Sequence, residues 1–592
     1  MKVRFVPAEK TIDVQPGTTV MKALLAAGLE LDAPCGGRGV CGKCRVTIID
    51  SHGEHQALAC QTEIHTDMTV DITRKDSGHR ILMGGISRDI KLSPAVKTFR
   101  VKIPQPTTSD LRSCWERVKD AVAKAAGITN AADIMPDPVV ASELYMVLTR
   151  NNFDVEVLMM GNNIIGVTAP GSPILGIAYD IGTTTIAGYL MNLRTGEQVS
   201  QSSLLNPQVK YGADVIMRTK YTIENGLEGP TQSVRKALSE IADKMLSETS
   251  FDKNYVYAVT VVGNTCMHHL FSGISPASLA YAPYTPAITE PIVANTREFG
   301  FSINPCAKLM LLPNIAGFVG ADTVGAALAS EMDKKEELTL LIDIGTNGEM
   351  VLGTKDYLAT CSTAAGPAFE GALITFGMRG AEGAIDHVSF EEGRLEYTVI
   401  GGGKPAGICG SGIIDLLSEL VRTGIVESGG RMKAPDELSN GLEKYMGYYK
   451  GQRCIVLAGK DISATDEDIV FTQKDVREVQ LAKGAMAAGI QMLCRRLGVS
   501  SSEIKSIMIA GAFGNYMKPS SACGIGLIPK ELKENVVAVG NAAGQGAKIS
   551  LLSVEEYKRA EKLSMSMDYL ELAADPAFQD VFVDQLEFPG DE

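Results

Sequence analysis

The alternation of apolar and polar positions predicts a small mixed domain at the start of the chain. Residues 3–15 (VRFVPAEKTIDVQ) have the pattern of a β-hairpin, and residues 19–29 (TVMKALLAAGL) have that of an amphipathic helix. Two further strands are predicted at residues 44–50 and 68–74. These elements together predict a domain over residues 1–84.

A second region follows a short linker at residues 85–94 (GISRDIKLSP). Residues 95–172 predict a small α/β middle domain. Its strands are expected at 96–106, 154–160 and 163–169, and its helices at 115–127 and 137–150. The sequence of this domain gives no indication of a chemical role.

From residue 173 onward, the pattern of strands and loops occurs twice. The matched pairs are 175–192 with 340–353, 257–269 with 506–517, and 311–328 with 536–552. Three matched elements in the same order are unlikely to arise by chance, so they indicate a duplicated fold. We expect one half over residues 173–330 and the other over residues 331–592.

Composition narrows the class of protein. The chain has 592 residues, enough for about four domains. Its net charge of −14 argues against general nucleic-acid binding. No apolar run is long enough to span a membrane, and the N-terminus lacks the apolar core of a signal peptide. We therefore expect a cytoplasmic protein, in which disulfides are uncommon and the 12 cysteines need another explanation.

Four of these cysteines lie close together: Cys35, Cys41, Cys44 and Cys60. Their spacing is C-x5-C-x2-C-x15-C, and four thiolates are what a [2Fe–2S] cluster requires. The loop also contains the glycines that close wrapping around a cluster needs, Gly36, Gly37, Gly39 and Gly42. With its predicted strands and helix, the region resembles a [2Fe–2S] ferredoxin domain with a β-grasp fold. The alternative is a zinc site, although zinc knuckles usually carry two C-x2-C pairs.

The other eight cysteines contain no C-x2-C pair, and we interpret most of them as small buried apolar residues. Cys409 differs from the rest because it lies in the glycine-rich segment ICGSG.

Each half of the duplicated region has Asp-Ile-Gly-Thr at the end of an apolar strand, at residues 180–183 and 343–346. Glycine lets the backbone approach a phosphate, and threonine hydroxyls can donate hydrogen bonds to its oxygens. Aspartate is a hard oxygen ligand for Mg²⁺. Two such hairpins facing each other can bind a triphosphate from both sides. The G-x4-G-K-[ST] loop is not found, so ATP would be bound by the hairpins instead.

The duplicated pattern resembles the superfamily of acetate kinase, sugar kinases, Hsp70 and actin. The resemblance implies an actin-like ATPase fold and assigns these nucleotide-binding positions: Asp180, Gly182, Thr183 and Thr184 in the first hairpin, Asp343, Gly345, Thr346 and Asn347 in the second, and Gly511, Ala512 and Gly514 in the adenosine-binding element. Asp322 lies in the segment that matches the connector between the halves, where it would help to hold Mg²⁺ or water.

Two segments at similar offsets after the hairpins contain further polar residues. Asn206, Gln208 and Asp214 follow the first hairpin, and Glu370 follows the second. Such groups can orient an attacking water or a partner loop. Helix capping and loop hydrogen bonding are the alternative for each of them. The acids expected to take part in catalysis are Asp180, Asp322, Asp343 and Glu370.

The combination of a one-electron carrier with an ATP-driven clamp suggests ATP-assisted electron transfer. In this domain order, the whole chain resembles the reductive activators of corrinoid enzymes, in their bacterial form with an N-terminal [2Fe–2S] domain. The resemblance implies that the protein takes an electron from a low-potential donor and reduces Co(II) to Co(I) in a corrinoid protein, with ATP and Mg²⁺ as cofactors beside the cluster. The implied partner belongs to a methyltransferase or O-demethylase system, and a homodimer is the default oligomeric state.

Three other functions stay open at this stage. The first is an activator ATPase for another low-potential enzyme, of the acyl-CoA dehydratase type. The second is a small-molecule kinase with a redox domain, which would phosphorylate a metabolite without a corrinoid protein. The third is an electron-transfer adaptor whose ATPase halves no longer hydrolyse ATP.

Overall fold

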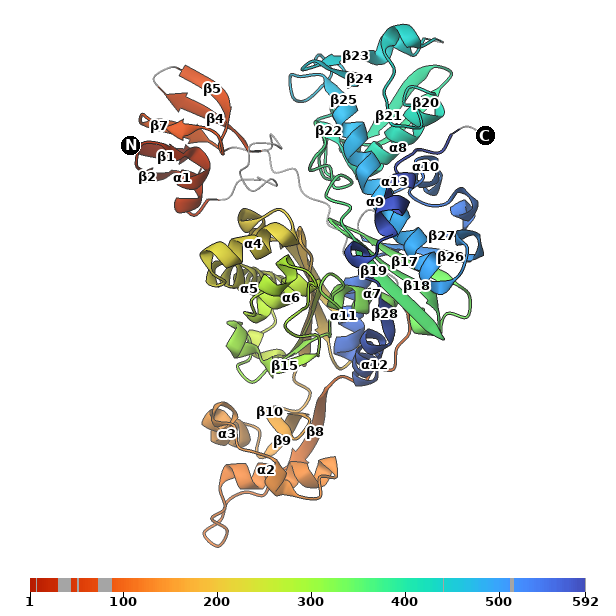
Figure 1. Cartoon of the computed structure of the whole chain (residues 1–592). Helices are drawn as coiled ribbons and strands as arrows, with labels where there is room; N and C mark the ends of the chain where they lie inside the picture. The colour runs from red at the N-terminus through yellow and green to blue at the C-terminus, as the bar shows by residue number, and fades with distance from the viewer. Residues whose placement is uncertain are drawn as a thin grey trace.

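The N-terminal domain has a β-grasp fold (Figure 1). The computed structural model describes residues 1–6, 8–29, 44–50, 53–72, 88–439, 441–511 and 516–590. The sheet of this domain has the order β2-β1-β7-β4-β5, in which β1 and β7 are parallel and β1 and β2 form the predicted hairpin. Its elements are β1 (Lys2–Val6), β2 (Lys10–Asp13), α1 (Val20–Ala26), β4 (Arg45–Asp50), β5 (Gly53–Leu58) and β7 (Met68–Asp71), with the short pair β3 (Thr18–Thr19) and β6 (Glu63–Ile64).

The middle domain lies at the opposite end of the molecule from the N-terminal domain (Figure 1). Two helices pack on a three-stranded sheet of order β10-β9-β8, as the sequence predicts. The elements are β8 (Val96–Lys102), α2 (Cys114–Ala126), α3 (Pro138–Arg150), β9 (Asp154–Met160) and β10 (Asn163–Thr168).

The first half of the duplicated region is built on a six-stranded sheet of order β13-β12-β11-β14-β16-β15. Its strands are β11 (Leu175–Ile181), β12 (Thr185–Asn192), β13 (Gln198–Leu205), β14 (Val256–Gly263), β15 (Ile292–Asn295) and β16 (Lys308–Leu311). Its helices are α4 (Val215–Asn225), α5 (Glu228–Thr249), α6 (Thr265–Ser272) and α7 (Ala321–Ala329). Alternate residues of β11 serve two cores, because Ile177 and Tyr179 pack with α5, while Ala178 packs on the side of α7.

The second half repeats this arrangement with a sheet of order β27-β26-β17-β18-β19-β28. Its strands are β17 (Thr339–Ile344), β18 (Gly348–Thr354), β19 (Tyr357–Thr363), β26 (Ser506–Ala510), β27 (Val536–Gly540) and β28 (Met567–Tyr569). In both halves the hairpin strands, the third strand and two parallel strands stand in the same order, so the predicted duplication is confirmed.

The second half also carries an additional lobe between β19 and β26. The lobe contains β20 (Ala384–Glu391), β21 (Arg394–Val399), β22 (Gly407–Ile408), β23 (Met446–Tyr449), β24 (Gln452–Ala458) and β25 (Ile469–Thr472). The helices here and after it are α8 (Gly410–Arg422), α9 (Gln473–Leu497), α10 (Pro519–Gly524) and, at the C-terminus, α13 (Phe578–Asp584). Arg45 of the N-terminal domain contacts this lobe through an ion pair with Glu467 at 3.3 Å.

Helices α7 and α11 (Ala542–Leu552) cross between the two sheets and join the halves. A Cβ atom on Gly546 would lie 2.1 Å from the carbonyl oxygen of Gly325, so only glycine allows the two helices to approach this closely. Helix α11 follows the last matched strand of the second half but packs on the first: Thr260 Oγ1 donates a hydrogen bond to the Ala547 carbonyl at 2.9 Å. Helix α12 (Val554–Ser566) continues this shared layer.

The cysteines outside the cluster region are mostly core residues, as the sequence predicts. Cys266, Cys306, Cys361, Cys409, Cys454, Cys494 and Cys523 are buried, and Cys114 is half-buried. Among the residues that the structure describes, no helix is both long and apolar enough to cross a membrane.

Candidate nucleotide site and cluster site

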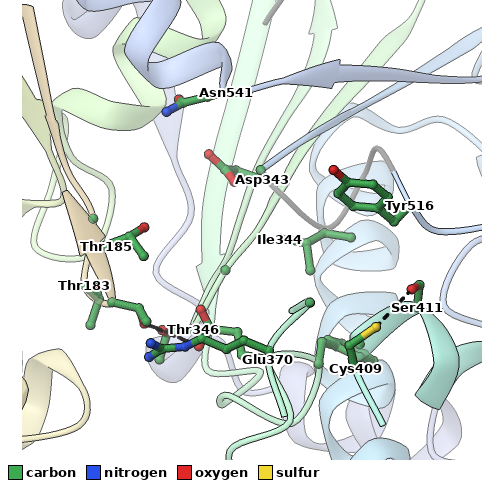
Figure 2. A pocket seen from close by; sticks show the side chains of 18 of the residues that line it. Thr183, Thr185, Asp343, Ile344, Thr346, Glu370, Cys409, Ser411, Tyr516 and Asn541 are labelled. Carbon is green, nitrogen blue, oxygen red and sulfur yellow. Dashed lines mark hydrogen bonds between the residues drawn. The ribbon is translucent and has the colours of Figure 1, made fainter. Parts of the chain in front are cut away.

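The turns of the two Asp-Ile-Gly-Thr hairpins face one cavity of about 570 Å³ (Figure 2). In the first half the turn joins β11 to β12, since Ile181 pairs with Ile186 across it. In the second half the turn joins β17 to β18 in the same way. The predicted residues that line the cavity are Asp180, Gly182, Thr183, Thr184, Asp322, Asp343, Gly345, Thr346, Asn347, Glu370 and Gly511. Ala512 and Gly514 lie outside the described residues.

Three half-buried aspartates from different elements line the cavity. Burial raises the pKa of Asp180 to about 7, and the charge of Asp322 adds to the shift. Burial likewise raises the pKa of Asp343 to about 7, with contributions from Asp322 and Asp180. The pKa of Asp322, in the first turn of α7, is raised by burial to about 6. The site therefore concentrates negative charge that only a cation or protons can neutralise.

Glu349 is a further acid of the cavity, which the sequence analysis missed. It lies on β18, two residues after Asn347, and lines the same cavity. Burial raises its pKa well above the usual range, and the charges of Asp322 and Asp343 act in the same direction. The signal that could have identified Glu349 is an acidic side chain in the mostly apolar strand that follows the turn of the second hairpin.

Glu370 connects the two hairpins. Its Oε2 accepts hydrogen bonds from Thr346 Oγ1 at 3.1 Å and from Thr184 Oγ1 at 3.5 Å. The two threonine hydroxyls are themselves 3.3 Å apart. Burial raises the pKa of Glu370, while the nearby Arg379 opposes that shift. A carboxylate placed between two such turns is suited to orient a water molecule there.

Buried side chains hold the first hairpin from behind. Arg218 on α4 is fully buried and donates hydrogen bonds to the carbonyls of Thr183 at 2.6 Å and Gly212 at 2.9 Å. Asn206 Nδ2 donates to the Gly182 carbonyl at 2.8 Å, and Asn264 Nδ2 donates to Thr183 Oγ1 at 3.0 Å. Within the described part of the chain no carboxylate forms an ion pair with Arg218, and burial lowers its pKa to about 10. The segment 206–218 therefore positions the hairpin.

The other polar residues predicted from this segment have structural roles. Asp214 is the N-cap of α4 and accepts a hydrogen bond from the Met217 N–H at 2.7 Å. Gln208 is buried, and its Nε2 donates to the Pro230 carbonyl at 3.0 Å. Neither residue lines the cavity, so the structure favours the alternative of capping and loop hydrogen bonding.

Oxygen donors make up most of the polar lining between the hairpins, and hard divalent cations such as Mg²⁺ prefer such donors. Burial is the main cause of the raised pKa values of Asp180 and Asp343, and the charge of Asp322 acts on both in the same direction. A divalent cation bound between them would relieve this repulsion, so the donor set fits Mg²⁺.

Two of the four cysteines predicted to bind a cluster lie in the described part of the chain. The Sγ atoms of Cys44 and Cys60 lie 3.2 Å apart, and Cys44 is fully buried. The Ala59 N–H donates to the Cys44 carbonyl at 2.8 Å, which fixes the two sulfur-bearing segments together. Cys35, Cys41 and the four loop glycines lie outside the described residues. Two thiols in contact, one just before β4 and one just after β5, fit a site for soft metal ions.

Comparison with known proteins covers the whole chain. Residues 4–65 match the model of the 2Fe-2S iron-sulfur cluster binding domain. Residues 85–172 match the RACo linker region, residues 175–335 the RACo middle region, and residues 337–592 the C-terminal domain of RACo, the ASKHA domain.

The corrinoid activation enzyme RamQ of Eubacterium limosum is 35% identical over 597 residues, which cover 98% of each chain. The chain belongs to the RACo family of reductive activators of corrinoid enzymes. A solved structure titled as the reductive activator for the corrinoid iron-sulfur protein aligns with a TM-score of 0.76 at 32% identity, covering 100% of this chain and 98% of the other.

A more distant relative is the [Co(II) methylated amine-specific corrinoid protein] reductase of Methanosarcina barkeri. It is 24% identical over 446 residues, which cover 70% of this chain and 77% of that protein. The family assignment confirms the predicted class: a [2Fe–2S] ferredoxin domain fused to an actin-like ATPase fold.

Proposed function

We propose that this family member is an ATP-dependent activator that passes one electron from its [2Fe–2S] cluster to a corrinoid protein and reduces Co(II) to Co(I). The observation that supports this most directly is the cavity between two matched phosphate-type hairpins, in the same chain as a ferredoxin domain. The names of the relatives, a corrinoid activation enzyme and a Co(II) corrinoid protein reductase, support the choice of partner.

In this proposal each group of cavity residues has a separate task. The turns at residues 182–184 and 345–347 bind the phosphates, and Asp180, Asp322 and Asp343 hold Mg²⁺ directly or through water. Glu370 orients the attacking water, because it already accepts hydrogen bonds from both turns. Gly511, with Ala512 and Gly514, forms the adenosine-binding element.

Cys35, Cys41, Cys44 and Cys60 are proposed to hold the cluster, which when bound supplies one-electron transfer. Clusters of the plant type have potentials near −400 mV. Each further 100 mV of uphill transfer costs about 2.3 kcal/mol per electron. Closure of the two halves around ATP can supply energy of this order if it favours a partner conformation in which cobalt is easier to reduce.

The corrinoid partner is proposed to belong to a methyltransferase or O-demethylase system, with a low-potential donor upstream. We also propose a cytoplasmic location, because cysteines that hold a cluster must stay reduced. A homodimer is the oligomeric state that we expect by default.

The test mixes the protein with Ti(III), a Co(II) corrinoid protein of such a system, and MgATP or no nucleotide, and follows the absorbance of Co(I). We expect Co(I) to form only when MgATP is present. Equal reduction without MgATP, or no reduction with any such corrinoid protein, contradicts the proposal. Phosphorylation of a small metabolite in the absence of a corrinoid protein would instead support the kinase alternative.

A further inference from the structure

The cavity has a second wall that the phosphate-type hairpins do not form. Figure 2 shows Thr183 and Thr185 on one side and Cys409, Ser411 and Tyr516 on the other. Asp386 of β20 also lines the cavity. The residues of this second wall come from three separate elements of the second half: Asp386 from β20, Cys409 and Ser411 from the start of α8, and Tyr516 from just before α10. A nucleotide in this cavity with its phosphates between the hairpins would extend its nucleoside toward these three elements.

A single buried carboxylate joins these three elements behind the cavity wall. Asp415 on α8 is 1% exposed. Its Oδ2 lies 2.8 Å from Nδ1 of His387 on β20 and 3.0 Å from Nζ of Lys518, the N-cap of α10. Its Oδ1 is buried without a hydrogen-bond partner among the described residues.

Each residue in this cluster is close in sequence to one that lines the cavity. His387 follows Asp386, and Lys518 lies two residues after Tyr516. Asp415 lies four residues after Ser411, so both side chains are on the same face of α8. Movement of any of the three elements at the cluster therefore displaces a side chain in the cavity wall.

The segment CGSGIID (409–415) gives α8 the close approach that this cluster needs. A Cβ atom on Gly412 would lie 2.3 Å from the Ile385 carbonyl oxygen, so any other residue would push α8 away from β20. The Cys409 N–H also donates to the Ile385 carbonyl at 3.0 Å. Two backbone contacts and one carboxylate thus fix the helix on the strand.

We propose that Asp415 is a positioning residue that fixes the nucleoside side of the cavity, and that it contributes to binding of ATP but not of a bare triphosphate. This inference rests on the nucleotide-binding function proposed above. A bare triphosphate contacts only the hairpin turns, whereas the base and ribose need the second wall in its fixed position.

The experiment compares binding of MgATP with binding of magnesium tripolyphosphate by calorimetry. In the full chain, Asp415→Asn is expected to weaken MgATP binding about tenfold, because a misplaced wall loses its fit. Binding of tripolyphosphate is expected to stay at the wild-type value. The matched control is Glu419→Gln, because Glu419 also joins α8 to β20, through the Phe390 N–H at 2.8 Å, but has no neighbour in the cavity wall.

If Asp415→Asn keeps the native melting profile and weakens binding of MgATP and of tripolyphosphate to the same extent, the proposal is overturned. Unchanged binding of both ligands overturns it as well. Lys518→Met provides a second variant that keeps the carboxylate with His387. This variant is also expected to bind MgATP more weakly and to bind tripolyphosphate as the wild type does. If it binds MgATP with wild-type affinity, that result counts against the proposal. Failure of the wild-type protein to bind MgATP at all would refute the proposed function rather than the role of Asp415.

Discussion

The side chain of Asn541 donates a hydrogen bond from Nδ2 to Oδ2 of Asp180 at 2.9 Å, although 361 residues separate the two in sequence. Asn541 is the N-cap of α11, and its Nδ2 also lies 3.1 Å from the buried Tyr189 hydroxyl. Because α11 packs on the first half, a residue of the second half holds the side chain of Asp180 in the first half.

We therefore expect Asn541→Ala to lower the kcat of ATP hydrolysis by about 10-fold to 100-fold, because Asp180 loses its fixed orientation. The KM for MgATP should change much less, since the hairpin turns remain in place. Steady-state phosphate release measures both constants. If a rise in the KM for MgATP accounts for the whole loss of kcat/KM, the result contradicts a role for Asn541 in orienting Asp180.

Glu370 is expected to act on the attacking water. Glu370→Gln should lower kcat by about 10²-fold to 10⁴-fold at an unchanged KM for MgATP, the range typical of a lost general base. Glu396→Gln, an exposed glutamate on β21, serves as the control and should hydrolyse ATP at the wild-type rate. Near-wild-type turnover by Glu370→Gln would show that its hydrogen bonds to Thr184 and Thr346 are only structural.

Arg218 should affect phosphate binding without preference for the nucleoside. In Arg218→Met the carbonyls of Thr183 and Gly212 lose their donor, so binding of MgATP and of magnesium tripolyphosphate should both weaken by about tenfold or more. Lys220→Met, an exposed cation on the same helix, should change neither. Calorimetry on the folded variant measures both affinities. Weaker binding of MgATP with unchanged binding of tripolyphosphate would contradict this role of Arg218.

The raised pKa values of Asp180 and Asp343 predict how the stability of the folded protein depends on pH. The folded-state pKa of Asp180 and Asp343, about 7, lies above the usual value of 3.8, so the folded protein binds more protons than the unfolded chain between these pH values. The stability contributed by these protons is fully present below pH 4 and is lost as the pH rises through 7.

Thermal unfolding should therefore show a melting temperature for the nucleotide-free protein that falls between pH 5 and pH 7. Asp180→Asn should flatten this dependence, because an amide carries no charge at either pH. Saturating MgATP should flatten it as well if Mg²⁺ binds the carboxylates. A melting temperature that rises over the same interval in the wild type and not in Asp180→Asn would contradict these pKa directions.

The cluster and nucleotide sites are expected to be separable. Cys60→Ser should abolish the visible absorbance of the cluster and leave MgATP binding at the wild-type value. Cys114→Ser, a half-buried cysteine of the middle domain, should retain full cluster absorbance. Loss of nucleotide binding in Cys60→Ser would show that the two modules do not fold independently.

Local patterns were sufficient to predict the hairpins at Asp180 and Asp343, because an apolar strand ending in Asp-Ile-Gly-Thr defines its own turn. The duplication predicted two matched halves, but the order of the strands in each sheet depends on long-range pairing that the sequence pattern does not give. Asn541 and Arg218 lie in segments that the sequence analysis marked, yet their roles depend on which elements meet in space. The same holds for Asp415, which reaches β20 only because α8 packs closely at Gly412.

The most direct test of ATP-dependent reductive activation is the time course of Co(I) absorbance in one mixture of Ti(III), Co(II) corrinoid protein and activator, before and after MgATP is added. Wild-type protein should produce Co(I) only after the addition. Asp343→Ala and Cys60→Ser should each produce none, the first for lack of ATP hydrolysis and the second for lack of a cluster. Co(I) formation before MgATP is added, or at the wild-type rate by Asp343→Ala, would contradict ATP-dependent reductive activation.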